Sequence, residues 1–348
     1  MEIFTVCPHH TDVFGARQEP GASYPSVLAA HGAMAEKLGA SAMLIFDFWQ
    51  SLDPWIAAQL IASGTATLEP IVAVNPALTH PAVAARSLAG LSYLYGRRIN
   101  LNVVAGAKAG ELAALGVAAG GDDKYGRMAE FIDGLRAVLA ARPHEGPRYR
   151  LDAPPLEPPA DPSLGPRIVA PGSRSPGADE VLPRLDRALV MARPRAAVAE
   201  EHWRLAGAGL NGGLAMIVGI VARDTAEEAW AVARQCYTGS RRDVLAGKVF
   251  SRQVTSSQHV ANLEAAAGAE VQDECLWYGA DRIGMDCPKL VGSYREVAAA
   301  LAAYGELGVR TVVLDLPFAL EEYEHIGRAL DPGAAASGVA RQPAPAIE

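Results

Sequence analysis

The chain has 348 residues, of which 50% are hydrophobic and 20% are charged, and its formal net charge is −8. A chain of this composition can bury a large core, which excludes a wholly disordered protein. The negative charge argues against broad electrostatic binding to nucleic acid or to acidic membranes. The length fits one α/β barrel of about 250 residues with insertions.

The cysteines and the apolar runs point to a cytoplasmic protein with no membrane partner. Four cysteines are too few for a disulfide scaffold, and no two of them form a Cys-x-x-Cys pair. No base flanks any of them, so each is expected to be a packed residue and not a nucleophile. The chain starts without a basic region followed by an apolar stretch, so no signal peptide is expected. The longest apolar run, residues 214–222, is too short to span a bilayer.

Short apolar runs alternate with stretches of helical length, a pattern typical of βα units around a parallel sheet. The fold class that we predict is therefore α/β, a (β/α)₈ TIM barrel with insertions. Eight runs are expected to be its strands, namely residues 3–6, 42–46, 68–74, 99–104, 168–170, 188–191, 214–222 and 311–314.

Helices are expected between the strands, and some have clear end signals. A helix over residues 24–38 is closed by Gly39, and Asp53 followed by Pro54 forms an N-cap with proline in the first turn. Further helices are expected to begin at Pro81 and to cover residues 125–140, 293–307 and 320–330.

The alternation breaks twice, at residues 142–166, where prolines cluster, and at residues 239–273. We interpret both as insertions into a single barrel domain over residues 1–331, the first as a surface excursion or short hairpin. Neither insertion separates segments that could each close a sheet. Residues 332–348 are mostly Ala, Gly and Pro and are expected to form a disordered tail.

In a parallel barrel, the catalytic residues lie at the carboxyl ends of the strands. After the fifth predicted strand, Gly172 lets backbone N–H groups approach an anion, and Ser173 and Ser175 supply hydroxyl donors. A helix N-terminus is expected to follow, and Arg174 could add a positive charge. These residues indicate a phosphate site, although Pro-Gly-Ser is also a common turn.

Two longer stretches carry a resemblance to a known family. Residues 75–86 read Asn-Pro-Ala-Leu-Thr-His-Pro-Ala-Val-Ala-Ala-Arg, and residues 96–106 read Gly-Arg-Arg-Ile-Asn-Leu-Asn-Val-Val-Ala-Gly. With shorter motifs in order along residues 1–330, they resemble the bacterial luciferase-like flavin-dependent monooxygenases, and among these the alkanesulfonate monooxygenase group. The shorter motifs lie at residues 123–125, 171–173, 222–225, 227–229, 276–277, 290–292 and 320–322.

The resemblance implies an enzyme that uses reduced FMN and dioxygen to oxidise a small organic substrate, with the FMN supplied by a separate NAD(P)H-dependent flavin reductase. It also implies a homodimer or higher homo-oligomer. Asn102 offers an amide for the flavin ring edge, or else a strand-end cap; Tyr125 could reach the phosphate or ribityl chain, or else packs against the loop. The cofactor-binding residues that the resemblance implies are Ser51, Asn75, Asn102, Ala105, Tyr125, Gly172, Ser173 and Arg174.

Three residues are candidates for catalysis. His10 stands where the sulfonate enzymes show a Pro-Thr-His-Gly-Asp pattern, so its imidazole could contact the substrate or act as a base. No metal is expected, because the pair His9 and His10 lacks a carboxylate at a clear spacing. His259, in the second insertion, could reach the site if that insertion acts as a lid; an exposed loop histidine is the alternative. Arg282 is the third candidate, because it lies near the position of an arginine of the sulfonate enzymes and could supply a positive charge at the site.

Departures from the sulfonate enzymes bear on the substrate. Ile217 and Gly219 stand where those enzymes carry an arginine and a histidine, and Ser51 where they carry a cysteine. Because a sulfonate needs fixed cationic donors, a simple alkanesulfonate is not expected, and a specialised substrate such as a biosynthetic intermediate is. Two alternatives stay open: a deazaflavin-dependent hydride-transfer oxidoreductase, and a non-catalytic flavin-binding member of the fold.

Overall fold

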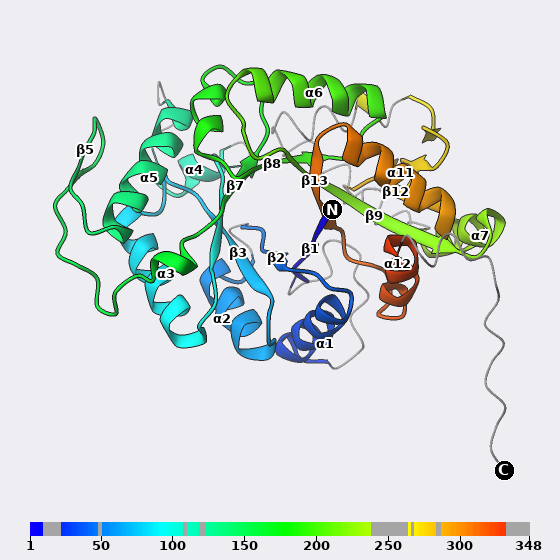
Figure 1. Cartoon of the computed structure of the whole chain (residues 1–348), viewed down its shortest axis with the longest axis horizontal. Helices are drawn as coiled ribbons and strands as arrows, with labels where there is room; N and C mark the ends of the chain where they lie inside the picture. Colours follow the sequence, from blue (N-terminus) through cyan, green and yellow to red (C-terminus); the bar gives the residue numbers. More distant parts are fainter. Residues whose placement is uncertain are drawn as a thin grey trace, which may run out of the picture.

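Eight parallel strands close into a barrel, which confirms the predicted fold class (Figure 1). The computed structural model describes residues 1–9, 22–47, 51–106, 110–117, 123–237, 264–265, 268–282 and 287–331. In order around the barrel, the strands are β1 (Glu2–Val6), β2 (Ala42–Leu44), β3 (Glu69–Val74), β4 (Asn100–Val103), β7 (Ile168–Pro171), β8 (Arg187–Met191), β9 (Leu214–Arg223) and β13 (Val309–Leu314). Each lies within two residues of its predicted position. The ring closes through pairing of β13 with β1.

Strand β9 extends beyond the barrel at its carboxyl end. Its first half pairs with β8 and β13, whereas Gly219 to Arg223 pair with β12 (Lys289–Ser293). The antiparallel strands β11 (Leu276–Trp277) and β10 (Val271–Gln272) continue this extension. None of these three strands was among the predicted elements, because each is short and two of them have only two residues.

The long helices lie around the outside of the barrel (Figure 1). Asp53 caps α2 as predicted, because its side chain accepts hydrogen bonds from the N–H groups of Trp55 and Ile56. Gly39, which follows α1, has a φ of +82°, a conformation that favours glycine. The helices are α1 (Tyr24–Lys37), α2 (Pro54–Gly64), α3 (Pro81–Tyr95), α4 (Glu111–Ala114), α5 (Lys124–Leu139), α6 (Arg195–Gly207), α7 (Ala226–Cys236), α10 (Gly279–Arg282), α11 (Tyr294–Glu306) and α12 (Glu322–Leu330).

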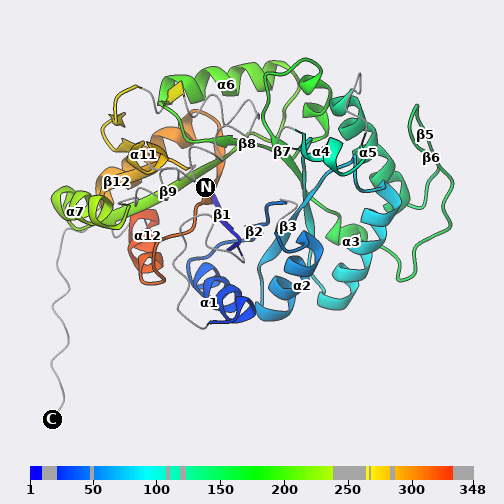
Figure 2. The same cartoon turned by 180° about the vertical axis from the view of Figure 1, so that it is seen from behind.

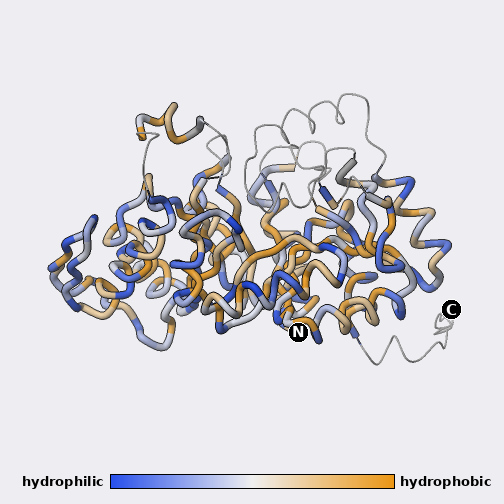
Figure 3. Tube along the Cα trace, turned by 90° about the horizontal axis from the view of Figure 1, so that it is seen from above, coloured by the Kyte–Doolittle hydropathy of each residue, from blue (hydrophilic) through white to orange (hydrophobic). Residues whose placement is uncertain are grey.

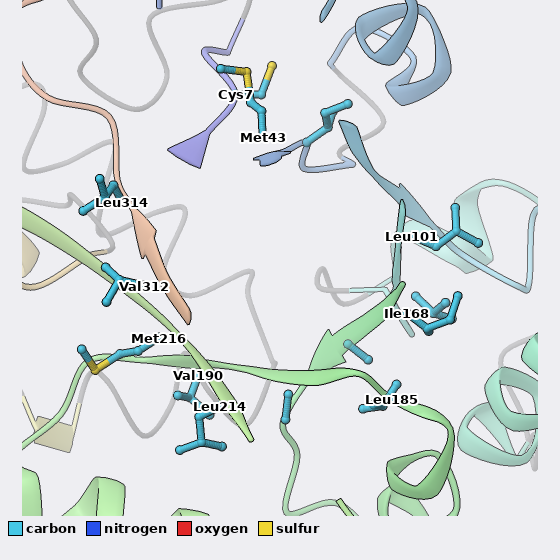
Figure 4. Close-up of a cluster of buried hydrophobic side chains, with 14 of the residues drawn as sticks. Cys7, Met43, Leu101, Ile168, Leu185, Val190, Leu214, Met216, Val312 and Leu314 are labelled. Carbon is cyan, nitrogen blue, oxygen red and sulfur yellow. The ribbon is translucent and has the colours of Figure 1, made fainter. Parts of the chain in front are cut away.

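The apolar core has two layers because successive side chains of a strand point to opposite faces. The outer layer lies between the strands and the helices, and Figure 4 shows Leu101, Ile168, Val312 and Leu314 pointing away from the barrel axis. In Figure 3, hydrophobic residues are concentrated in the interior of the barrel, and hydrophilic residues are more frequent at its periphery. The inner layer fills the lumen with Phe4, Val6, Ala42, Leu44, Ile71, Val169, Leu189, Ala215 and Val313.

Charged residues close the lumen at the amino ends of the strands. Arg167 forms ion pairs of 2.6 Å with both Glu2 and Glu69, and Arg187 lies 3.9 Å from Glu2. A cavity of about 50 Å³ lies between this network and Phe4. Because ion pairs span this end and its cavity is small, the carboxyl ends of the strands are the place to look for a larger ligand.

The first predicted insertion contains a hairpin of β5 (His144–Glu145) and β6 (Arg150–Leu151), which projects at the edge of the barrel beside α5 (Figures 1 and 2). The second insertion lies largely outside the described residues, and residues 332–348 lie wholly outside them. The division into one domain with two insertions and a tail stays a prediction. No helix in the described part of the chain is long and apolar enough to cross a membrane.

Candidate functional site

Polar side chains follow several strands at the carboxyl end of the barrel. The alternation of β3 that points Ile71 into the lumen also points Asn75 there, directly after the strand. On β4, Asn102 is the parallel partner of the lumen residue Val169, and on β13 Asp315 follows the lumen residue Val313 by two positions. The open end of the lumen therefore carries two amides and a carboxylate above the apolar side chains that fill the lumen.

Asn102 is the clearest ligand-binding candidate among them. It is only 2% exposed, and its Oδ1 accepts no hydrogen bond from any residue that the structure describes. A buried amide oxygen without a donor costs about 1–3 kcal/mol, so such atoms usually have a ligand or water as partner. The prediction of Asn102 as a cofactor-binding residue is therefore consistent with its surroundings.

Asn75 shapes the neighbouring turn. Its Oδ1 accepts a hydrogen bond of 3.0 Å from the N–H of Ala77, which fixes the side chain after β3. Gly106 has a φ of +89°, and a Cβ added there would lie 3.4 Å from Asn75 Nδ2. The loop after β4, which includes the half-buried Ala105, thus packs directly against the Asn75 turn.

Tyr125 and Ser173 come together although they are 48 residues apart. The Tyr125 hydroxyl lies 2.7 Å from Ser173 Oγ, and both residues are buried. Asp123 caps the start of α5 by accepting a hydrogen bond from the N–H of Gly126, which places Tyr125 in the first turn. Ser173 Oγ also accepts a hydrogen bond of 3.1 Å from the N–H of Ser175. The structure thus joins two of the predicted phosphate-binding residues.

The predicted helix N-terminus after this loop is wrong. Three-residue 3₁₀ turns, Ala178–Glu180 and Leu182–Arg184, follow the loop before β8 begins. A turn this short aligns too few peptide dipoles to attract an anion as a helix does. The N–H of Gly172 is itself donated to the carbonyl of Leu189 at 2.8 Å, so it continues the barrel ladder.

Arginines surround one buried carboxylate beside this loop. Glu201, on α6, is 1% exposed and accepts hydrogen bonds from Arg174 at 3.0 Å and Arg204 at 2.8 Å, with Arg193 3.8 Å away. Burial alone would raise the pKa of Glu201, but Arg204 and Arg174 hold it below its usual value. Arg174 also pairs with Glu200, so its charge is matched on α6, and phosphate contact by Arg174 stays a prediction.

Arg204 and Arg193 link this network to the loop. Arg204 donates a hydrogen bond of 2.8 Å to the carbonyl of Ser173, and the buried Arg193 follows the end of the adjacent strand β8. The Nε of Arg193 has no hydrogen-bond partner within the described ranges. Arg174 and Arg204 are matched by Glu200, Glu201 and Asp179, so the Nε of Arg193 is the donor of this network that the described residues leave for an anionic group.

Sequence reasoning missed an ion pair beside β9, the strand that follows β8 around the barrel. Lys289 is fully buried at the start of β12 and pairs with Asp315 after β13. The aromatic residues Tyr237, Trp277 and Phe318 pack around this corner. A lone lysine at the start of an apolar run was the available signal, but its partner is 26 residues further along the chain.

The remaining predicted site residues are resolved to different degrees. Ser51 precedes the N-cap of α2, and its Oγ lies 3.3 Å from the carbonyl of Leu52. His10 and His259 lie outside the described residues, and for Arg282 only the backbone in α10 is described. At the end of β1, burial raises the pKa of the Cys7 thiol to about 12, so this cysteine stays protonated.

The chemistry of the described donors and acceptors fits FMN. An unpaired buried amide oxygen suits a ring N–H, the hydroxyls of Tyr125 and Ser173 beside arginines suit a phosphate, and the apolar lumen between them suits an aromatic ring system. Asn102 and Asn75 would hold the ring edge, with Tyr125 and Ser173 at the phosphate end.

Comparison with known proteins agrees with this geometry. The family model described as luciferase-like monooxygenase matches residues 1–311. The chain is 32% identical over 311 residues to the 4-(gamma-L-glutamylamino)butanoyl-(BtrI acyl-carrier protein) monooxygenase BtrO of Niallia circulans, covering 85% of this chain and 87% of that protein.

Solved structures that share the fold include two with a TM-score of 0.74 and 17% identity each. EDTA monooxygenase from Chelativorans sp. BNC1 aligns over 95% of this chain and 93% of its own. Riboflavin lyase, solved with modified FMN and riboflavin, aligns over 98% of this chain and 94% of its own. The chain therefore belongs to the luciferase-like monooxygenase family and is an oxidoreductase.

Proposed function

We propose that this monooxygenase is the oxygenating half of a two-component system that uses reduced FMN, delivered by a separate NAD(P)H-dependent reductase. The observation that carries the proposal is the buried, unpaired Oδ1 of Asn102 in the lumen. When bound, reduced FMN supplies the electrons that activate dioxygen for insertion of one oxygen atom into a substrate.

The residues of the chain would bind and orient the FMN and exclude water from the site. Asn102 accepts a hydrogen bond from the ring edge, and Asn75 keeps the adjoining loop in place. Tyr125 and Ser173 bind the phosphate, Arg204 holds the Ser173 carbonyl, and Arg193 supplies an N–H donor. The apolar lumen residues exclude water, which keeps the activated oxygen for the substrate. His10, His259 and Arg282 remain proposed as contacts to the substrate.

The proposed substrate is an amide-bearing biosynthetic intermediate, not a simple alkanesulfonate. BtrO, as its name states, acts on an amide-containing acyl chain carried by an acyl-carrier protein, and it is related to this chain over most of both lengths. At the barrel mouth, Lys289 is already matched by the carboxylate of Asp315. A sulfonate would therefore meet a neutral ion pair there, without a free cation from Lys289.

Anaerobic titration of the purified protein with reduced FMN, followed by admission of oxygenated buffer in the presence of candidate substrates, tests this function. We expect saturable binding and an oxygenated product. Binding of the reduced deazaflavin coenzyme in place of reduced FMN, with no consumption of dioxygen, would replace this proposal with hydride transfer. Binding of reduced FMN without formation of product from any candidate substrate would favour a non-catalytic role.

We also propose that two copies associate through α2 and α3. Val83 and Leu94 on α3 and Ile56 on the neighbouring α2 are exposed apolar side chains. Gly90 lies on the same stripe as Val83 and Leu94, and a Cβ added there would meet nothing within 4 Å. A glycine in the middle of a helix costs about 1 kcal/mol, a cost that close approach of a second helix would explain.

A further inference from the structure

The buried Lys289 forms an ion pair with the half-buried Asp315 at the mouth of the barrel. Lys289 is 1% exposed and its Nζ donates to Asp315 Oδ2. The ammonium also lies 5.3 Å from the ring centroid of Tyr237, on the side of the aromatic corner. The two charged residues come from β12 and from the end of β13, strands that both pair with β9.

The lysine side chain crosses β9 on the lumen face. Lys289 is the direct parallel partner of Gly219, so the side-chain directions at these two positions are the same. Ala215 and Ile217 belong to the lumen cluster, and the alternation continues to Gly219. A Cβ added at Gly219 would lie 2.1 Å from Lys289 Cδ, so a larger residue there would displace the lysine side chain from its present path to Asp315.

The two side chains of the ion pair differ in their exposure. The lysine is enclosed, whereas the Asp315 side chain keeps 27% of its exposure. Burial alone would lower the pKa of Lys289, but the adjacent Asp315 carboxylate raises it well above its usual value, so the lysine stays charged. A ligand entering the mouth therefore meets the exposed part of the Asp315 carboxylate, whose charge is largely balanced by the enclosed Lys289 ammonium.

Stability alone does not account for such a pair. Burying two charges costs free energy that well-packed apolar side chains of the same size would not, and the replacement is often neutral or stabilising. The ion pair to Lys289 orients Asp315, and the open path over Gly219 lets the lysine reach it, an arrangement suited to presenting the carboxylate to a ligand.

We propose that Asp315, oriented by Lys289, is a specificity-determining residue that accepts a hydrogen bond from an amide N–H of the substrate. This inference rests on the proposed function, because it assigns the substrate side of the same site. A neutral N–H donor suits a carboxylate whose charge is already balanced, whereas an anionic headgroup finds an acceptor oxygen there and no free cation. Lys289 acts as a positioning residue through Asp315.

The test uses three matched amphiphiles as probes: N-methylbutanamide, which carries an N–H donor, N,N-dimethylbutanamide, which lacks one, and butane-1-sulfonate. Their affinities are measured by saturation-transfer NMR on the full chain. The variants are the double substitution Lys289→Met with Asp315→Leu, which removes both charges together, and Gly219→Ala, which displaces the lysine. A control double variant, Lys37→Met with Glu324→Leu, removes an exposed ion pair elsewhere.

We expect the wild type and the control to bind N-methylbutanamide at least about fivefold more tightly than the dimethyl analogue, and butane-1-sulfonate least. The double variant should lose this preference, and Gly219→Ala should reduce it about threefold, while circular dichroism confirms folding of both. An unchanged preference in the folded variants, or a wild type that selects the sulfonate or binds neither amide, overturns the inference. Reduced FMN binding is measured on the same samples, and its absence in the wild type would defeat only the proposed function.

Discussion

Asn100 and Asn102 project from the same face of β4, yet only the first has both ends of its amide paired. Asn100 Nδ2 donates to Glu69 at 2.9 Å, and its Oδ1 accepts from the N–H of Arg167 at 2.9 Å. Asn102 Oδ1 has no partner within the described ranges, although Asn102 is equally buried. One strand thus carries a structural amide at the closed end of the lumen and an unpaired one at the open end.

Substituting Asn102→Leu should separate stability from cofactor binding. Removal of the unpaired oxygen is expected to raise the free energy of unfolding by about 1 kcal/mol. The affinity for reduced FMN should fall about tenfold, because the ring edge loses its acceptor. Urea unfolding and anaerobic flavin titration measure the two effects.

The matched control is Asn100→Leu, which should behave in the opposite way. It leaves Glu69 and the N–H of Arg167 without their amide partner, so the free energy of unfolding should fall by about 2 kcal/mol. The flavin affinity of the folded fraction should hardly change. If both leucine variants lose stability equally, Asn102 is a structural residue and has no special role in binding.

Tyr125→Phe and Ser173→Ala should each weaken reduced FMN binding about fivefold, through loss of a donor to the phosphate. Because the two hydroxyls lie 2.7 Å apart and act as a unit, the double variant should be little worse than either single one. Tyr149→Phe is the control, since its hydroxyl donates to the carbonyl of Pro76 and not to Ser173. Strictly additive losses would show that the hydroxyls bind independently.

His31 should make the stability of the protein depend on acid pH. This histidine is buried on α1, its Nδ1 lies 3.1 Å from the Tyr323 hydroxyl, and burial lowers its pKa to about 4. The unfolded chain, with a pKa of about 6.5, takes up the proton first, so stability is complete above about pH 6.5 and is lost as the pH falls toward about 4.

The measurement is urea unfolding of the wild type and His31→Gln at about pH 7.5 and about pH 5. Between these values, the wild type should lose about 2 kcal/mol more than the variant, because the variant has no imidazole to titrate. Other titrating groups are common to both proteins and cancel in the difference. A difference that does not vary with pH would mean that His31 titrates normally in the folded state.

Leu94→Glu should dissociate the proposed dimer. Leu94 is exposed on α3, and a carboxylate there would be buried without a partner in a two-copy interface. Sedimentation velocity should show a shift from about twice the chain mass to the chain mass, with an unchanged circular dichroism spectrum. Trp203→Glu, an equally exposed position on α6, is the control and should leave the assembly intact.

The sequence by itself determined the architecture, because the signals for barrel strands and helix ends are local. The eight apolar runs lie within two residues of the barrel strands, and Asp53-Pro54 and Gly39 mark helix ends as expected. Each of these signals depends on neighbours within one or two turns of chain. The polar residues after the strands were identifiable for the same reason, since the carboxyl end of each strand can be found from its run.

Only the tertiary structure decided how those polar residues are paired. The proximity of Tyr125 and Ser173, the ion pair of Arg174 with Glu201, and the path of Lys289 over Gly219 to Asp315 join residues that lie between 26 and 70 positions apart. Arg174 illustrates the consequence, because its charge is matched on α6 by two carboxylates that no local pattern connects to it. Ion pairs form where barrel closure and strand register bring side chains together. Register and closure depend on several strands at once, so no single stretch of the chain predicts them.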